Sequence, residues 1–275
     1  MAPHHDGTTT AAGQRQRPPL AVWPCAQHSG TPPQEELTQR LITDLSAPGD
    51  TVVALCHGEG TALAQAAAMG RSVHGIEVQP ERVRAAQRRL RERLPAERRR
   101  EVVHWQADAR TAEVLLAPVR GRTRLVLLRL PRAGRHTDAP EATVRGDHFG
   151  RLTGAAYARA VQSLIAAAAG LLRAGGHLAL ICSGHGQVGR EADLVTVCAH
   201  AAHAAGLAYV QHIIALTTPV SVDATKQAEE CGGVPGGKEL GAAHAKAVTT
   251  LITPCHDDVM LLHKPAAGPA GEAGR

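Results

Sequence analysis

Short apolar segments alternate with longer amphipathic segments through most of the chain. Seven short segments have the length and apolar content of buried strands: 51–56, 72–78, 102–105, 124–130, 177–182, 207–216 and 258–263. Segments with apolar residues every three or four positions predict helices over about 31–45, 62–69, 80–94, 157–172 and 192–205. Strands that alternate with helices are typical of a sheet covered by helices on both faces. The pattern therefore predicts an α/β fold with a seven-stranded, mostly parallel sheet.

The turn after the first predicted strand is rich in glycine. It consists of Gly58, Glu59, Gly60 and Thr61 and opens a helix of small residues, and the next strand ends at Glu77. Glycines let the backbone pass close to a ligand, and a carboxylate at this strand end can accept hydrogen bonds from both hydroxyls of a ribose. The order of strand, turn, helix, strand and acid predicts a site for a ribose-containing cofactor. An ordinary solvated Glu77 is the alternative.

Composition narrows the classes of partner. Hydrophobic residues make up 44% of the 275 residues but aromatic ones only 2%, so we expect an aliphatic core. Single-strand nucleic-acid sites use aromatic side chains that stack on bases, so the composition counts against such a binder. The formal net charge of +5 is compatible with a polyanionic partner without demonstrating one. The basic run from Arg82 to Arg100 is either a solvated helix face or a contact surface for DNA.

Cysteine and histidine positions predict no metal site. The six cysteines show no Cys-x-x-Cys spacing, and a partly solvated helix face accounts for His200 and His203. The cysteines fit free thiols in a reducing cytosol, with Cys56 and Cys182 as small hydrophobic residues of core strands. No apolar run approaches the ~20 residues that cross a bilayer, and the N-terminus lacks the layout of a signal peptide. We expect a cytoplasmic protein with no membrane partner.

The chain is expected to form one folded domain over residues 19–265. Residues 1–18 are polar and residues 266–275 are rich in Pro, Ala and Gly, so both are predicted to be disordered tails. Residues 218–254, between the last two predicted strands, form an insertion that contains Gly, Ala and Lys. No internal repeat is visible.

Several short motifs, taken together, resemble a known family. Six segments carry the resemblance: Trp23–Gln27, Gly58–Thr61, Gly75–Glu77, Ala107–Arg110, Leu172–His177 and His256–Pro265. The second is similar to the family's Asp-Pro-Phe-x-Gly-x-Gly-Thr turn, the fourth to its Gly-Asp-Ala-Arg element, and the last to its closing His-Glu-x-Val-Leu-Val-Phe-x-Lys strand. From about Val22 to Pro265 the chain resembles bacterial, actinobacterial-type DNA methyltransferases that use S-adenosylmethionine to modify adenine N6 or cytosine N4.

The resemblance implies a Rossmann-like methyltransferase sandwich that binds S-adenosyl-L-methionine without a metal. It assigns the Gly58–Thr61 turn to cofactor binding, Glu77 to the ribose and Asp108 to the adenine amino group. It also places the segment before Asp50 over the methionine end of the cofactor. For Asp108, capping of the following helix is the alternative role.

Two departures from the family concern the chemistry. Ala54–Cys56 stands where the family has Asp-Pro-Phe, so the acid near the amino-acid end of the cofactor is absent. At the end of the fourth predicted strand, the degenerate catalytic motif consists of Arg129, Leu130, Pro131 and Arg132. The family has Asp/Ser/Asn-Pro-Pro followed by an aromatic residue here, and these side chains hold the extruded base. A guanidinium has no acceptor atom for an amino group, so amino methylation by the usual route is expected to be impaired.

The resemblance therefore implies a methyltransferase-like protein with impaired or lost catalysis. DNA, bound weakly and without sequence preference, is the implied partner. Two alternatives stay open. One is a non-catalytic regulatory module that binds the cofactor or DNA, and the other is a methyltransferase that acts on RNA or a small molecule.

Overall fold

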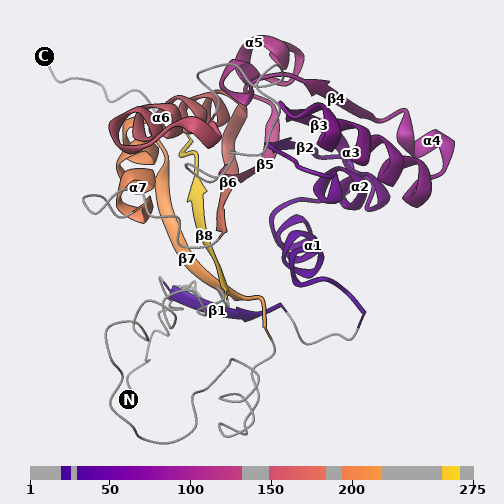
Figure 1. The fold of residues 1–275 in the computed structure, drawn as a ribbon, viewed down its shortest axis with the longest axis horizontal. Helices are drawn as coiled ribbons and strands as arrows, with labels where there is room; N and C mark the ends of the chain where they lie inside the picture. Colours follow the sequence, from indigo (N-terminus) through magenta and orange to yellow (C-terminus); the bar gives the residue numbers. More distant parts are fainter. Residues whose placement is uncertain (1–19, 26–29, 132–148, 184–193, 219–255, 267–275) are drawn as a thin grey trace, which may run out of the picture.

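A mixed β-sheet forms the centre of the protein (Figure 1). The computed structural model describes residues 20–25, 30–131, 149–183, 194–218 and 256–266. In these segments eight strands lie in the order β1-β7-β8-β6-β5-β2-β3-β4. They are β1 (Leu20–Pro24), β2 (Thr51–Leu55), β3 (Ser72–Glu77), β4 (Val102–Gln106), β5 (Thr123–Arg129), β6 (Leu172–Ser183), β7 (Ala208–Leu216) and β8 (His256–His263). The predicted tails except residue 266, the 218–254 insertion except residue 218, and Arg132 lie outside the described residues.

The α-helices and short 3₁₀ turns connect these strands. The α-helices are α1 (Pro33–Leu45), α2 (Thr61–Ala68), α3 (Pro80–Arg93), α4 (Ala96–Arg99), α5 (Ala112–Leu115), α6 (Gly154–Leu171) and α7 (Leu194–Ala204). The 3₁₀ turns are η1 (Ala109–Thr111), η2 (Ala117–Val119) and η4 (Phe149–Arg151).

The sheet differs from the seven-stranded, mostly parallel sheet that the sequence pattern predicts. β1 adds an eighth strand, which pairs parallel with β7 from Leu20↔His212 to Pro24↔Leu216. β8 runs antiparallel to both of its neighbours, β6 and β7, so the sheet is mixed. The pattern misses β1 because prolines flank this short segment, and proline removes a ladder donor. An edge strand tolerates that loss on its open side, and β1 is an edge strand.

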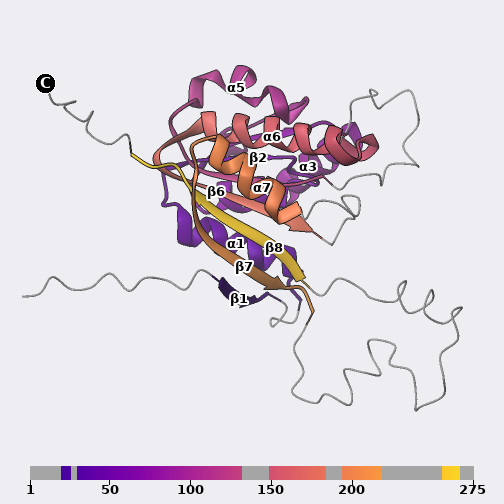
Figure 2. The same ribbon diagram turned by 90° about the vertical axis from the view of Figure 1, so that its left-hand side faces the viewer.

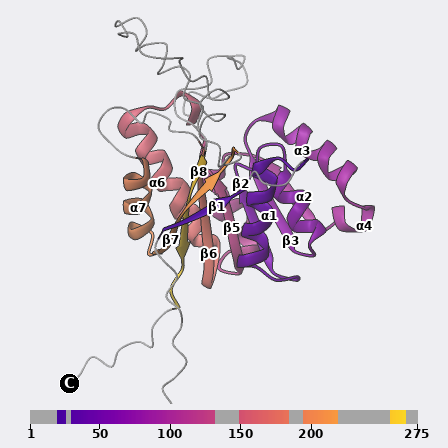
Figure 3. The ribbon, with the colours of Figure 1, turned by 90° about the horizontal axis from the view of Figure 1, so that it is seen from below.

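Helices cover both faces of the sheet (Figures 2 and 3). Successive strand residues point to opposite faces, so Val52 belongs to the core under α1, α2 and α3, whereas Val53 belongs to the core under α5, α6 and α7. Both cores are aliphatic, as the composition predicts, and Tyr157 is the largest fully buried side chain. Strands that are buried on both faces have continuous apolar runs, which explains the uninterrupted pattern along β2 and β5.

The strand order reverses beside β2. The chain passes from β2 outward to β3 and β4 and then returns to β5, which pairs parallel with β2 on its other side. The loops after β2 and β5 therefore leave the sheet in opposite directions. Such a switch point opens a crevice at the carboxyl ends of the strands, where α/β proteins bind ligands.

Lys264, directly after β8, anchors the far end of α6. Its Nζ donates hydrogen bonds to the carbonyl oxygens of Ala169 (2.8 Å) and Leu172 (2.9 Å). A cation at a helix C-terminus satisfies free carbonyl groups and interacts favourably with the helix dipole. The lysine of the closing motif thus has a structural role in this chain.

Candidate functional site

The turn between β2 and α2 has an unusual backbone. Cys56 (φ 54°), Gly58 (φ 58°) and Gly60 (φ 81°) all have left-handed conformations. Cys56 is the only non-glycine residue with positive φ among the described residues, and such conformations collect at functional sites. The turn places the N-terminus of α2 at the carboxyl edge of the sheet.

The two glycines of this turn have different surroundings. A Cβ atom at Gly58 would meet no atom within 4 Å, whereas a Cβ atom at Gly60 would lie 2.7 Å from Cβ of Ala86 in α3. Gly58 therefore borders open space, and Gly60 allows α3 to pack against the start of α2. The close approach of the backbone to a ligand, expected at both glycines, has room at Gly58 only.

Glu77 connects the end of β3 to the glycine turn. Its side chain is buried (3% exposed), its Oε2 accepts a hydrogen bond from the Gly58 N–H (2.9 Å), and its Oε1 accepts one from the Gln79 N–H (3.0 Å). The alternative of an ordinary solvated Glu77 is therefore wrong. Each carboxylate oxygen can accept a second hydrogen bond, so the group keeps acceptor capacity for hydroxyls.

Asp108 caps the turn that follows β4. Its Oδ1 accepts a hydrogen bond from the Arg110 N–H (2.8 Å), which is the capping role considered from the sequence. Its carboxylate also forms an ion pair with the guanidinium of Arg110, which in turn lies 5.6 Å from the ring centre of Phe149. An adenine amino group would have to share this carboxylate with Arg110.

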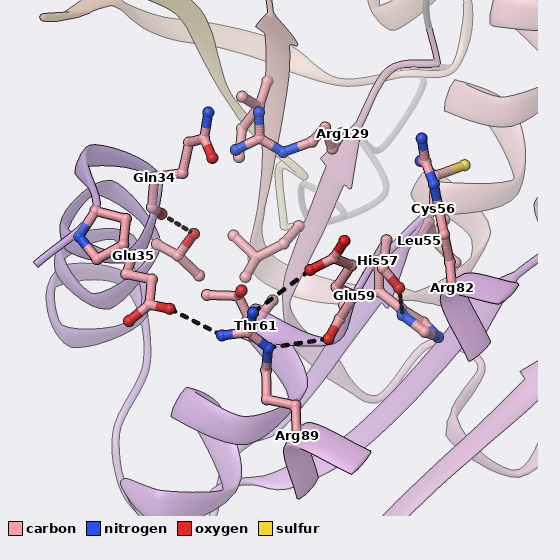
Figure 4. Close-up of a pocket in the computed structure, with 17 residues that line it drawn as sticks. Gln34, Glu35, Leu55, Cys56, His57, Glu59, Thr61, Arg82, Arg89 and Arg129 are labelled. Atoms are coloured by element: carbon pink, nitrogen blue, oxygen red, sulfur yellow. Dashed lines mark hydrogen bonds and ion pairs between the residues drawn. The ribbon is translucent and has the colours of Figure 1, made fainter. Parts of the chain in front are cut away.

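A cavity of about 380 Å³ lies between α1, the β2–α2 turn, α3 and the ends of β5 and β6 (Figure 4). Of the residues predicted from the sequence, four line it: Gly58, Glu59, Thr61 and Arg129. Five do not line it: Gly60, Glu77, Asp108, Leu130 and Pro131. Its apolar wall includes Ala54, Leu55, Leu127 and Ile181.

Charged side chains of α1, α3, the β2–α2 turn and β5 line the cavity. Nη1 of Arg89 lies 2.8 Å from Oε1 of Glu35, and its Nη2 lies 3.6 Å from Oε2 of Glu59. In the view of Figure 4 this network lies below Arg129. Nη1 of Arg129 lies 3.4 Å from Oδ2 of the buried Asp257. Both arginines thus line the cavity with their charge partly compensated.

The cavity residues on α3 and at or near the start of α1 were not predicted as site residues from the sequence. They are Pro32, Gln34, Glu35, Thr38, Arg82 and Arg89. Glu35 and Arg89 lie 54 positions apart in the chain, and no local motif connects them. The only signal was the resemblance that places the segment before Asp50 over the cofactor, and α1 does border the cavity.

Titratable groups near the turn are held in their neutral forms. Burial, reinforced by the carboxylates of Glu77 and Asp108, raises the pKa of the Cys56 thiol far above its usual range, so this thiol is no nucleophile at neutral pH. Burial, with a smaller effect of His104, lowers the pKa of His57 from 6.5 to about 4. The neutral His57 donates its Nδ1–H to the carbonyl oxygen of Gly58 (2.9 Å).

Leu130, directly after β5, is part of the core. Leu130 is buried, and its N–H donates to the carbonyl oxygen of Ile181 (2.9 Å). The hydroxyl of Tyr157 donates to the carbonyl oxygen of Pro131 (2.8 Å), and burial raises the Tyr157 pKa well above its usual value. These contacts attach the end of β5 to β6 and α6.

Three further properties of the described segments concern metals, membranes and thiols. In the described segments no group of three or more His, Cys, Asp or Glu side chains is arranged to hold a metal ion. None of the helices in these segments has the length and apolar character needed to cross a bilayer. Cys25, Cys56, Cys182 and Cys198 are free thiols.

Comparisons with known proteins place the fold. No family model and no curated protein sequence matches the chain. Among solved structures, TrmN from Thermus thermophilus is similar with a TM-score of 0.50 and 17% identity, over 84% of this chain and 48% of that one. The chain therefore spans about half the length of TrmN.

A second solved structure is similar over nearly its whole length. It is geranyl diphosphate C-methyltransferase from Streptomyces coelicolor A3(2), in complex with Mg²⁺, geranyl diphosphate and S-adenosyl-L-homocysteine. Its TM-score is 0.51 at 11% identity, and the match covers 89% of this chain and 91% of that one. At such identities the likeness concerns the fold alone. The chain has the Rossmann-like fold of S-adenosylmethionine-dependent methyltransferases.

Proposed function

We propose that the chain binds S-adenosyl-L-methionine, or its demethylated product, at the carboxyl ends of β2 and β3. We further propose that it is a DNA amino-methyltransferase-like protein whose methyl transfer is impaired or lost. The observation that carries the proposal is the buried Glu77 carboxylate, which is bonded to the Gly58 N–H at the switch point of the sheet. The methyltransferase fold of the chain supports it.

The residues at this edge fit the chemical parts of such a cofactor. The free acceptor sites of Glu77 suit the two ribose hydroxyls. The amino-acid end of the cofactor is a zwitterion, and the Arg89–Glu35 pair offers both signs of charge at the cavity wall. When bound, the cofactor supplies an electrophilic methyl group on a positively charged sulfur. Ala54 offers no acid, so we expect weaker binding than in the intact family.

The magnitude of this weakening follows from the missing contact. A charge-assisted hydrogen bond is typically worth about 1.5–3 kcal/mol, which corresponds to a roughly 10- to 150-fold difference in affinity. Glu35 and Glu59 supply carboxylates elsewhere in the cavity wall, but both already interact with Arg89. We therefore expect no compensation for the missing acid from these two carboxylates.

Impaired catalysis follows from the residues at the end of β5. Methyl transfer to an exocyclic amino group needs acceptors around the nitrogen and a ring stacked on the base. Arg129 has no acceptor atom, and its guanidinium is directed at Asp257. Leu130 is buried in the core and is not an aromatic platform. The positive charge of Arg129 at the cavity wall would also disfavour a bound sulfonium.

Methyl transfer to a small molecule is the second candidate. The observation in its favour is the cavity itself, which has the size of a small-molecule pocket and an apolar wall formed by Leu55, Leu127 and Ile181. Arg129 at this wall suits a substrate with an anionic group, because a guanidinium binds carboxylates and phosphates well. A regulatory module that binds the cofactor without transfer needs the same site and no reaction.

Calorimetric titration tests cofactor binding. S-adenosylmethionine and S-adenosylhomocysteine are titrated to millimolar concentration into the wild type, Glu77→Gln and the control Glu92→Gln, whose side chain is exposed on α3. Glu77→Gln keeps the size and one acceptor oxygen but loses the charge, so we expect affinity to fall roughly 10-fold or more while the control stays unchanged. Circular dichroism confirms that each variant is folded. Absence of binding in the wild type, or equal affinity in Glu77→Gln, would refute the assignment.

A further inference from the structure

The positive charge of the chain is concentrated on two helices. Residues 80–101, which contain α3 and α4, hold nine arginines and four glutamates. Their net charge of +5 equals the formal net charge of all 275 residues. The rest of the chain is therefore neutral as a whole, and this basic segment, residues 80–101, determines the sign of the protein's charge.

Most of these arginines point into solvent. α3 buries Val83, Ala86 and Leu90, whereas most of its other side chains are exposed. Seven arginines of the basic segment are exposed: Arg82, Arg84, Arg88, Arg91, Arg93, Arg98 and Arg100. α3 and α4 lie at the outer edge of the molecule, beside the β3–β4 end of the sheet (Figure 1).

Few carboxylates neutralise this surface. Arg84 pairs with Glu81 and Arg98 pairs with Glu101, and such exposed pairs contribute little. The guanidinium groups of the other five exposed arginines form no hydrogen bond or ion pair with another described residue: Arg82, Arg88, Arg91, Arg93 and Arg100. A cluster of uncompensated guanidinium groups creates a positive potential that attracts polyanions.

The lack of exposed apolar side chains in the segment favours some classes of negatively charged partner over others. No large hydrophobic side chain in residues 80–101 is exposed, and the segment contains no aromatic residue. A helix that docks on a membrane places an apolar face in the lipid, but here the apolar residues of α3 are already buried within the protein. Protein interfaces have an apolar centre with few charges, and single-strand sites use stacking rings. Binding to a nucleic-acid duplex requires neither an apolar centre nor stacking rings, because the phosphates of a duplex lie on its outer surface.

We propose that the basic segment binds the phosphate backbone of duplex DNA. A helix of 14 residues is about 21 Å long and fits the wide major groove of B-form DNA, where phosphates flank it on both sides. The major groove of duplex RNA is deep and narrow and admits no helix, which favours DNA. The inference rests on DNA as the partner in the proposed function, but it does not require that the cofactor binds.

The test compares two triple variants that lose the same charge. Arg88→Gln/Arg91→Gln/Arg93→Gln neutralises the basic segment, and glutamine keeps helix propensity. The matched control is Arg122→Gln/Arg151→Gln/Arg159→Gln, three exposed arginines on other elements. Fluorescence anisotropy with a short mixed-sequence DNA duplex gives the affinity of each protein as a function of salt concentration.

We expect the basic-segment variant to bind more weakly and with a flatter salt dependence. Each lost phosphate contact lowers the slope of log affinity against log salt concentration by about 0.9. If three contacts are lost, the affinity of the variant should fall roughly 40-fold less than that of the wild type when the salt concentration is raised fourfold. The control should retain the wild-type slope. Equal loss in both variants, or no binding of the duplex at low salt, would overturn the proposal.

Competitors test the choice of duplex DNA. Duplex RNA, single-stranded DNA and polyglutamate of equal total charge are added to the wild-type complex with duplex DNA. Weaker competition by all three supports the proposal, and equal or stronger competition by any of them overturns it. The calorimetric titration with S-adenosylmethionine is independent of this assay, so failure of DNA binding and failure of cofactor binding are distinguished.

Discussion

The two glycines of the β2–α2 turn should respond differently to the same substitution. Both have left-handed backbones, with φ of 58° at Gly58 and 81° at Gly60, which costs a non-glycine residue roughly 1–2 kcal/mol. Only at Gly60 does the added methyl carbon collide, 2.7 Å from Cβ and 3.0 Å from Cα of Ala86. Overpacking of this kind costs about 1–3 kcal/mol more. We therefore expect Gly58→Ala to lower the free energy of unfolding by about 1–2 kcal/mol and Gly60→Ala by about 2–5 kcal/mol.

Denaturant unfolding measures both losses, and Ala86→Gly isolates the packing contribution. In the Gly60→Ala background, Ala86→Gly removes one of the two colliding methyl groups, so it should cost less than the ~1 kcal/mol that glycine costs in a normal helix. A double-mutant cycle should give a coupling energy of about 1 kcal/mol or more between the two positions. Equal losses at Gly58 and Gly60, or a coupling energy near zero, would refute the interpretation that Gly60 exists for the contact with α3.

Three further predictions concern the site. Arg110→Met should raise the affinity for S-adenosylmethionine several-fold in calorimetry, because it removes the guanidinium that competes with the adenine amino group for the Asp108 carboxylate; unchanged or lower affinity would contradict a role of Asp108 in adenine binding. Because burial lowers the pKa of His57 from 6.5 to about 4, His57 contributes roughly 3 kcal/mol of stability above pH 6.5 that disappears as the pH falls toward 4. Denaturant unfolding should therefore lose less stability on acidification in His57→Gln than in the wild type, and equal losses would contradict the depressed pKa. Transfer of labelled methyl groups to mixed genomic DNA by the wild type should be negligible, and robust transfer would contradict the role assigned to the degenerate motif. The Arg129→Asp variant should also be less stable than the wild type, because the substitution places a carboxylate beside the buried Asp257.

Local pattern predicted the elements that form the sheet centre. The apolar runs 51–56, 72–78 and 124–130 correspond to β2, β3 and β5, because strands buried on both faces need continuous apolar sequence. The glycine turn was predicted at its observed place, and Glu77 was singled out as the acid that follows it. Both features depend on the conformation of a few neighbouring residues, which the sequence encodes directly.

Pairing across the sheet could not be predicted in the same way. β1 is a short segment between prolines, and its partner β7 lies about 190 residues further along the chain. The direction of β8 relative to both neighbours likewise depends on where the chain returns to the sheet. Neither property follows from periodicity, because periodicity reports which face of a strand is buried and not which strand lies beside it.

The candidate site also combines features that are encoded locally in the sequence with contacts between residues that are distant in the chain. The sequence by itself determined that a glycine turn and an acid would meet at a strand edge, that position 54 carries an alanine and no acid, and that the basic charge collects in residues 80–101. Only the tertiary structure decided that Arg89 meets Glu35 and that Arg129 meets Asp257, across 54 and 128 positions of the chain. The physical reason is that charge and hydrogen-bonding capacity belong to single residues, whereas the partner that compensates them is chosen by the packing of distant elements.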